Sequence, residues 1–166
     1  MEYAMKNTLI ILLIFITALI TSRAFALNRV LSFDGDGDYV EISDSESLNA
    51  ITSQVTMEAW IKATKFMNEW MPIIYKGDER TSDAYENRSY GLSLNSSGLI
   101  HLASAPSGQG QVYLNSPSGL IALNRWYHVT GIIDTKSGVM SILINGVEVA
   151  RQDFGKDIHL SALPLR

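Results

Sequence analysis

The chain has 166 residues, of which 46% are hydrophobic and 18% are charged, and its formal net charge at pH 7 is −4. This composition suits one globular domain, and the acidic balance excludes the clustered lysines and arginines of a nucleic-acid-binding surface. The absence of cysteine excludes disulfide bonds, thiolate metal sites and cysteine nucleophiles.

Residues 1–26 predict a cleavable secretory signal peptide. Lys6 supplies a positive charge, residues 9–20 form a short apolar segment, and Ala24-Phe25-Ala26 has the small residues of a cleavage site. The segment is shorter than the roughly 18–20 residues of a spanning helix, so we expect no membrane insertion after cleavage; an uncleaved anchor is the alternative. We therefore expect a secreted, periplasmic or extracellular protein, and an exported chain without cysteine suggests a bacterial source.

Residues 27–166 predict one all-β domain. Alternating apolar and polar positions, or short apolar runs between turn residues, predict strands at residues 55–62, 72–75, 89–94, 98–103, 127–134, 139–144 and 147–151. Gly98 and the pair Asn145-Gly146 predict tight hairpin turns, because these residues accept positive φ angles. A single helical turn is expected between residues 43 and 51. Turn residues recur about every ten positions, which is typical of an antiparallel sandwich or barrel.

Two tryptophans lie in or directly beside predicted strands. Trp60 lies in an alternating strand, and Trp126 directly precedes another. Buried aromatic side chains contribute large packing energies, so we predict that both belong to the core.

Three segments resemble the laminin-G-like jelly-roll domains of the concanavalin A-like lectin/glucanase superfamily. Residues 31–42 resemble the opening strands, and residues 55–62 resemble a T-x-E-A-W-I-K strand. Residues 124–129, with Ile144-Asn145-Gly146, resemble the W-x-H-V and x-N-G elements of a later hairpin. The resemblance implies an antiparallel β-sandwich over residues 27–166, a fold that lectins, adhesins, hydrolases and attached modules share.

The resemblance also implies further strands after residue 166. Related domains continue beyond a P-L-x-I-G segment, and Leu163-Pro164-Leu165 matches its beginning. A sheet without its closing strands would expose backbone edges and apolar surface. We therefore expect a C-terminally truncated domain, with a complete compact domain as the alternative.

Asp34, Asp36 and Asp38 place carboxylates at alternate positions, which is a suitable beginning for an oxygen-liganded calcium site. An EF-hand loop is excluded, because Tyr39 and Ser45 stand where that loop needs Gly and Glu. An acidic β-turn stays open as the other interpretation, because Asp and Gly both favour turns. In the domains that the chain resembles, calcium often bridges the first turn and the closing strands, which points to Asp34 in particular.

Asp36, Asp38 and Glu41 also follow the D/E-x-D-x-x-E order of retaining glucanases of this superfold. Such enzymes need two carboxyl groups about 5–5.5 Å apart on one face, and Glu41 has the opposite parity to the two aspartates. The three histidines lack metal-ligand spacing, and His128 is predicted as a packed core residue. We therefore expect no enzymatic activity, with a glycoside hydrolase that uses Glu41 and Asp38 as the alternative.

Aromatic residues in and beside the predicted loops are candidates for ligand binding. Their rings can stack on sugars, and the candidates are Trp70, Tyr75, Tyr85 and Tyr113, with Tyr90 beside them. The alternative is that some of these rings cover the ends of the sandwich. We predict a secreted, non-catalytic module that recognises a glycan or an extracellular protein, assisted by calcium if the aspartates bind it. A structural fragment without independent activity is a further hypothesis.

Overall fold

A computed structural model describes residues 29–67, 70–77, 88–106, 110–155 and 157–166. The predicted signal peptide and Tyr85 lie outside these ranges. The chain divides into residues 1–34 and residues 35–166, and both sheets belong to the second unit. Within the described ranges, no helix combines the length and the apolar character that a membrane crossing needs.

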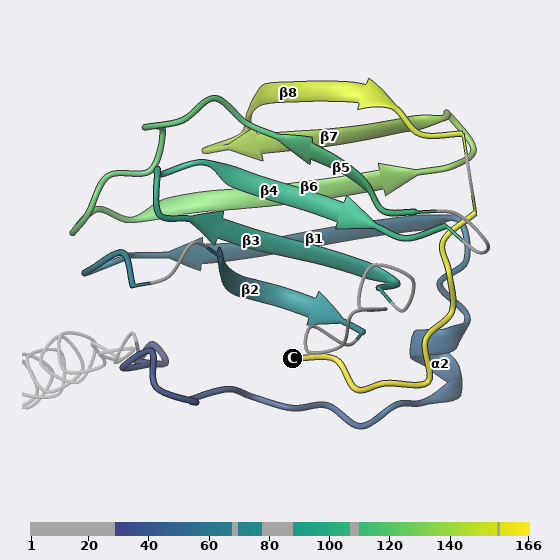
Figure 1. Ribbon diagram of the computed structural model, residues 1–166, viewed down its shortest axis with the longest axis horizontal. Helices are drawn as coiled ribbons and strands as arrows, with labels where there is room; N and C mark the ends of the chain where they lie inside the picture. The colour runs from purple at the N-terminus through teal and green to yellow at the C-terminus, as the bar shows by residue number, and fades with distance from the viewer. Residues whose placement is uncertain (1–28, 68–69, 78–87, 107–109, 156) are drawn as a thin grey trace, which may run out of the picture. The chain divides into compact units, whose positions relative to one another are not determined.

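Two four-stranded antiparallel sheets form the unit of residues 35–166 (Figure 1). The first has the order β1-β6-β7-β8, with the bounds Gln54–Ile61, Tyr127–Asp134, Val139–Ile144 and Val147–Asp153. The second has the order β2-β3-β4-β5, with the bounds Trp70–Lys76, Tyr90–Asn95, Ile100–Ser104 and Val112–Asn115. One helical turn, α2 (Glu46–Asn49), precedes β1. The predicted antiparallel sandwich and the predicted helical turn are confirmed.

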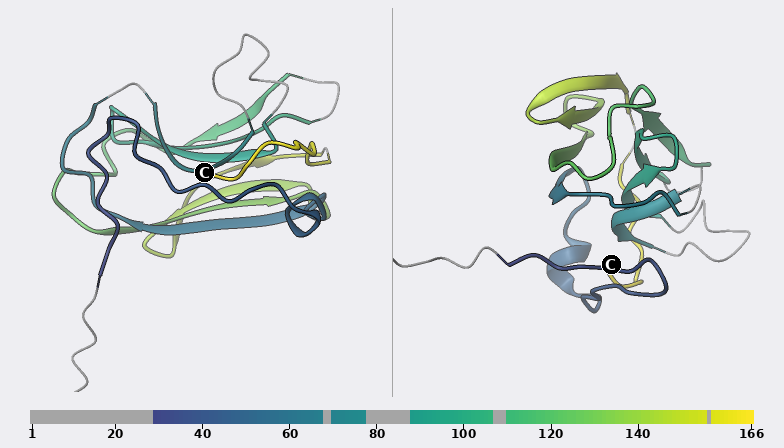
Figure 2. Two further views of the ribbon diagram at one scale, coloured as in Figure 1. Left: turned by 90° about the horizontal axis from the view of Figure 1, so that it is seen from below. Right: turned by 90° about the vertical axis from the view of Figure 1, so that its left-hand side faces the viewer.

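Apolar side chains from the inner faces of both sheets share one core, and Figure 2 (left) shows the two layers edge-on. Leu92 and Leu102 of the second sheet are fully buried, as are Val129 and Ile142 of the first. A Cβ atom at Gly131 of β6 would lie 2.9 Å from a methyl carbon of each of these leucines. The two sheets therefore pack in direct contact over Gly131, where no other residue would fit without displacing them.

Both predicted tight turns have the expected backbone. Gly98, between β3 and β4, has a φ of 75°, while Asn145 and Gly146, between β7 and β8, have φ angles of 52° and 78°. Positive φ at both central residues is typical of a type I′ hairpin turn, which matches the twist of its strands. The predictions at these turns are confirmed, because local conformational preference decides them.

The core prediction is wrong for two tryptophans. Trp60 is 65% exposed and Trp126 is 47% exposed. Trp60 shares its parity with the exposed Thr56 and Glu58, whereas Met57 on the other face of β1 is buried. Strand parity therefore overrides the apolar character of Trp60, and its ring lies against His128, with the two centroids 5.3 Å apart. His128 is itself partly exposed, so its predicted burial in the core is wrong as well.

The opening strands implied for residues 31–42 are also absent from this described part of the chain. Its only bridge joins Ile42 to Leu165, and Leu165 is bridged in turn to Lys76 of β2. Lys76 is almost fully buried, and its Nζ donates hydrogen bonds to Asp44 Oδ1 (2.7 Å) and to Leu163 O (2.8 Å). The bond from Lys76 also holds the pKa of Asp44 below its usual value. Lys76 thus ties the segment before α2 and the last residues of the chain to β2.

Candidate functional site

The outer face of the second sheet carries two rows of side chains across its four strands. The β2–β3, β3–β4 and β4–β5 registers align one row as Tyr75, Gly91, Ala103 and Tyr113. The adjacent row is Pro72, Ser93, His101 and Asn115. Residues of the opposite parity, including Leu92, Leu102 and Leu114, face the core. Alternation along the strands thus gathers polar and aromatic side chains on the outer face.

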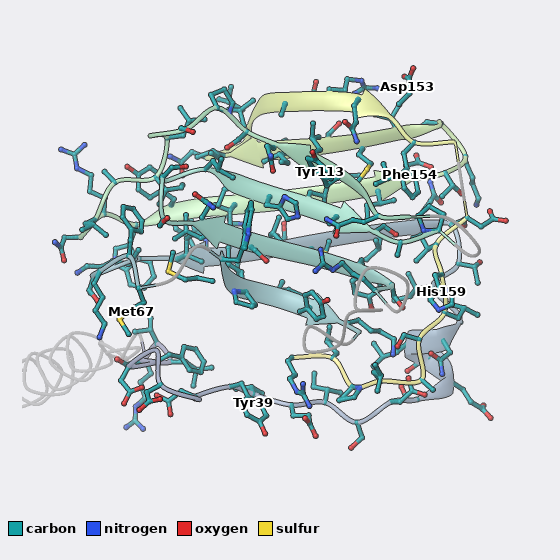
Figure 3. The ribbon with its side chains drawn as sticks, viewed as in Figure 1. Tyr39, Met67, Tyr113, Asp153, Phe154 and His159 are labelled. Atoms are coloured by element: carbon teal, nitrogen blue, oxygen red, sulfur yellow. The ribbon has the colours of Figure 1, made fainter. Side chains whose placement is uncertain are left out.

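Two exposed aromatic rings flank one histidine on this face. Trp70, at the start of β2, is 42% exposed, and Tyr113 of β5 is 54% exposed. The ring centroid of His101 lies 4.6 Å from that of Trp70 and 5.5 Å from that of Tyr113. Figure 3 labels Tyr113 on β5, in the sheet that lies in front. The sheet therefore brings together Trp70 and Tyr113, two of the four aromatic candidates, although 42 positions separate them in the sequence.

His101 is buried below these rings and is held by two amide side chains. Its Nδ1 lies 2.7 Å from Asn115 Oδ1, and its Nε2 lies 3.3 Å from Gln111 Nε2. Both bonds form when Nδ1 donates its proton to Asn115 and Nε2 accepts a proton from Gln111. Burial lowers the pKa of His101, the bond to Asn115 opposes this shift, and the charge of Arg88 adds to it. The imidazole is therefore neutral and fixed in one orientation at neutral pH.

This arrangement predicts that stability depends on pH. The pKa of His101 is lower in the folded chain than the ordinary value of 6.5, so the unfolded chain binds more protons as the pH falls below that value. We expect the free energy of unfolding to be maximal above pH 6.5 and to decrease as the pH falls toward the folded-state pKa of His101. Urea unfolding at about pH 7.5 and about pH 5.5 measures the change.

The control for this prediction is His101→Gln. Glutamine still offers a hydrogen-bond donor and an acceptor, but it does not titrate. Asp44 and Asp134 both have pKa values below their ordinary 3.8, so they stay ionised in this pH range and contribute equally to both proteins. If the free energy of unfolding falls equally in His101→Gln and in the unchanged chain between the two pH values, the pH dependence does not come from His101.

Tyr75 does not lie where the sequence suggested. It is only 4% exposed, so its assignment as a surface ring for stacking on sugar is wrong. A Cβ at Gly91 would lie 2.9 Å from Tyr75 Cδ2, which shows that the Tyr75 ring lies directly over the glycine backbone. The guanidinium of Arg88 covers the ring, with its Cζ 4.9 Å from the ring centroid, and Arg88 Nε donates a 2.9 Å hydrogen bond to Tyr75 Oη. Tyr75 thus supports the side chain of Arg88. Tyr90 is buried in the core.

The predicted calcium ligands Asp34, Asp36 and Asp38 lie before α2 in the chain. No group of three His, Cys, Asp or Glu side chains is placed to hold a metal ion in the described part of the chain. Asp34 belongs to the unit of residues 1–34, whereas Asp36 and Asp38 belong to the other unit. Calcium binding by these three aspartates stays a prediction.

The carboxylates of the alternative hydrolase interpretation lie in the same region. Glu41 Oε2 accepts a 2.9 Å hydrogen bond from Arg166 Nε, so an ion pair occupies this carboxylate. Asp38 and Glu41 precede β1 and belong to neither sheet. The Trp70, His101 and Tyr113 group on the outer face of the second sheet includes neither of them.

Comparisons with known proteins agree with this architecture. Residues 34–165 match the Laminin_G_3 family model, described as the concanavalin A-like lectin/glucanases superfamily. The CBM40 domain of the IT-sialidase of Ruminococcus gnavus, bound to α2,3-sialyllactose, superposes with a TM-score of 0.59 and 16% identity, covering 76% of this chain and 75% of that chain. No curated protein matches the chain.

Two further solved structures share the fold. The same CBM40 domain bound to α2,6-sialyllactose has a TM-score of 0.60 and 15% identity, over 76% of this chain and 75% of that chain. The binding domain of botulinum neurotoxin DC, in complex with SialylT, has a TM-score of 0.53 and 19% identity, over 74% of this chain and 29% of that chain. Together with the two described sheets, the family match over most of the sequence shows that the chain belongs to the laminin-G-like family of the concanavalin A-like lectin/glucanases superfamily.

Proposed function

We propose that the chain is a secreted, non-catalytic module that binds carbohydrate on the outer face of the second sheet. One observation carries this proposal: Trp70 and Tyr113 come from the two edge strands of the sheet, and both rings lie against His101. The rings remain about half exposed while the imidazole between them is buried. Exposed aromatic faces beside buried, oriented polar groups are a suitable surface for a sugar, which has both apolar faces and hydroxyl groups.

Polar atoms around His101 support a hydroxyl-bearing ligand. Asn115 and Gln111 already orient the imidazole, and Gln111 Oε1 is a buried acceptor without a hydrogen-bond partner in the described part of the chain. Buried acceptors are normally satisfied, so a water molecule or a ligand hydroxyl that reached this oxygen would complete the network. The similar domains solved with sialyllactose support carbohydrate as the ligand class.

Glycan-array binding by the purified chain tests the proposed function. We expect a defined subset of glycans to bind, and we expect no release of reducing sugar from those glycans on prolonged incubation. Release of sugar that Glu41→Gln abolished would establish the hydrolase instead. No binding to any glycan would refute the carbohydrate proposal.

Calcium binding is a separate proposal, and the proposed glycan site does not depend on it. If Asp34, Asp36 and Asp38 bind calcium, about millimolar calcium will raise the melting temperature above that measured in a chelator, because a ligand of the native state stabilises it. The measurement is a thermal unfolding curve of the purified chain under the two conditions. Coincident curves would favour the acidic β-turn interpretation of these residues.

A further inference from the structure

Arg88 is a half-buried cation next to the proposed glycan site. It precedes β3, and its side chain crosses the outer face, where Arg88 Cδ lies 3.7 Å from the position of a Cβ atom at Gly91. The guanidinium stacks on the Tyr75 ring, and the Tyr75 hydroxyl accepts a bond from its Nε. Stacking and hydrogen bonding together hold the guanidinium plane in one place.

The charge of Arg88 is not neutralised by the described part of the chain. No carboxylate there forms an ion pair with Arg88, and its terminal nitrogens make no hydrogen bond to the described residues. Other partly buried cations of the chain do have acidic partners, such as Lys76 with Asp44 and Arg166 with Glu41. A guanidinium retains its charge in proteins, so Arg88 presents charged donors that no residue of the described ranges uses.

Arg88 is also close enough to the aromatic group to act on it. Its Cδ lies 3.7 Å from a Cβ position at Gly91, and Gly91 pairs with Ala103, two residues from His101 on the same face of β4. The positive charge of Arg88 contributes to the lowered pKa of His101, which lies between the rings of Trp70 and Tyr113. The Arg88 side chain and the aromatic group therefore share the outer face of the second sheet.

We infer that the saccharide bound at Trp70 and Tyr113 carries a carboxylate, which pairs with Arg88. This inference rests on the proposed function and specifies its ligand as an acidic sugar. The planar fork of a guanidinium matches the two oxygens of a carboxylate, and the stack on Tyr75 leaves its terminal nitrogens available for that pairing.

The test compares glycans that differ only in charge. The array contains sialylated, uronic-acid, sulfated and neutral glycans, and the carboxylated glycan that binds best is then compared with its own methyl ester by calorimetry. We expect the methyl ester to bind about tenfold to a hundredfold more weakly, since it cannot form charge-assisted hydrogen bonds. We expect Arg88→Gln to weaken binding of the acid by a similar factor and to leave the affinity for the ester unchanged. Arg88→Lys should bind the acid with an affinity between those of the unchanged chain and Arg88→Gln, because lysine keeps the charge without the planar fork.

The control variant is Arg125→Gln, which removes the same charge from an exposed arginine before β6 and should leave both affinities unchanged. The inference is overturned if the best-bound glycans are neutral or only sulfated, or if the ester binds as tightly as the acid. It is also overturned if Arg88→Gln weakens acid and ester equally, which would indicate a purely structural role. In each of these cases glycan binding itself remains, whereas the absence of all glycan binding refutes the proposed function instead.

Discussion

Replacing Trp70 by alanine is expected to weaken glycan binding by about 2 kcal/mol or more, about thirtyfold in the dissociation constant, without unfolding the chain. Trp70 is 42% exposed and is not part of the hydrophobic core of the described residues, so its loss should disturb the fold little. Tyr113→Ala should have a similar effect, because both rings lie against His101 and come from the two edge strands of the sheet. Isothermal titration with the best glycan of the array measures both losses.

Trp60→Ala is the matched control for this prediction. It removes the same side chain from another exposed position, on the outer face of the other sheet. Its glycan affinity should equal that of the unchanged protein. Equal losses in Trp60→Ala and Trp70→Ala, or no loss in either, would place the ligand elsewhere.

Replacing Gly98 by alanine is expected to destabilise the fold by about 2–4 kcal/mol. Gly98 has a φ of 75°, and a Cβ added there would lie 2.6 Å from the carbonyl oxygen of Ile121. The substitution therefore combines an unfavourable backbone conformation with an overlap against backbone, which a rotamer change cannot relieve. The effect is read as the loss in free energy of unfolding by urea denaturation.

Gly138→Ala separates the two contributions. Gly138 has a φ of 72°, but a Cβ there would meet no atom within 4 Å. Its substitution should therefore lower the free energy of unfolding only through the unfavourable backbone conformation, by about 1 kcal/mol. Equal losses in Gly98→Ala and Gly138→Ala would show that the chain between β5 and β6 does not pack on the β3–β4 turn as the structure has it.

The hairpins follow from the sequence because neighbouring residues decide them. The pairings of β3 with β4 and of β7 with β8 join segments a few positions apart, and Gly98 and Asn145-Gly146 specify their turns through their own backbone preferences. Alternation alone also predicted the strand that contains Trp60. The parity that Trp60 shares with Thr56 and Glu58 indicates the outer face, but distant parts of the chain decide whether that face is covered.

The candidate site could be predicted only in part. The aromatic character of Trp70 and Tyr113 is visible in the sequence, but their meeting at His101 depends on the pairing of β2 with β3 and of β4 with β5. His101 and Arg88 were missed as site residues. The alternation of residues 98–103 places His101 on the face opposite Leu102, which is the one local signal that could have pointed to it. Nothing in the sequence marks Arg88, whose position depends on the ring of Tyr75 and on the absence of a side chain at Gly91.

By itself the sequence determined that this chain builds short antiparallel strands with tight turns, because side-chain alternation and positive-φ residues act over a few neighbouring positions. Only the tertiary structure decided which rings are exposed and which polar groups share a face. Tyr75 and Trp70 lie on the same strand, yet one ring is covered by Arg88 while the other remains open beside His101. Burial of a ring depends on what the adjacent strands and distant segments place over it, and that information is not local.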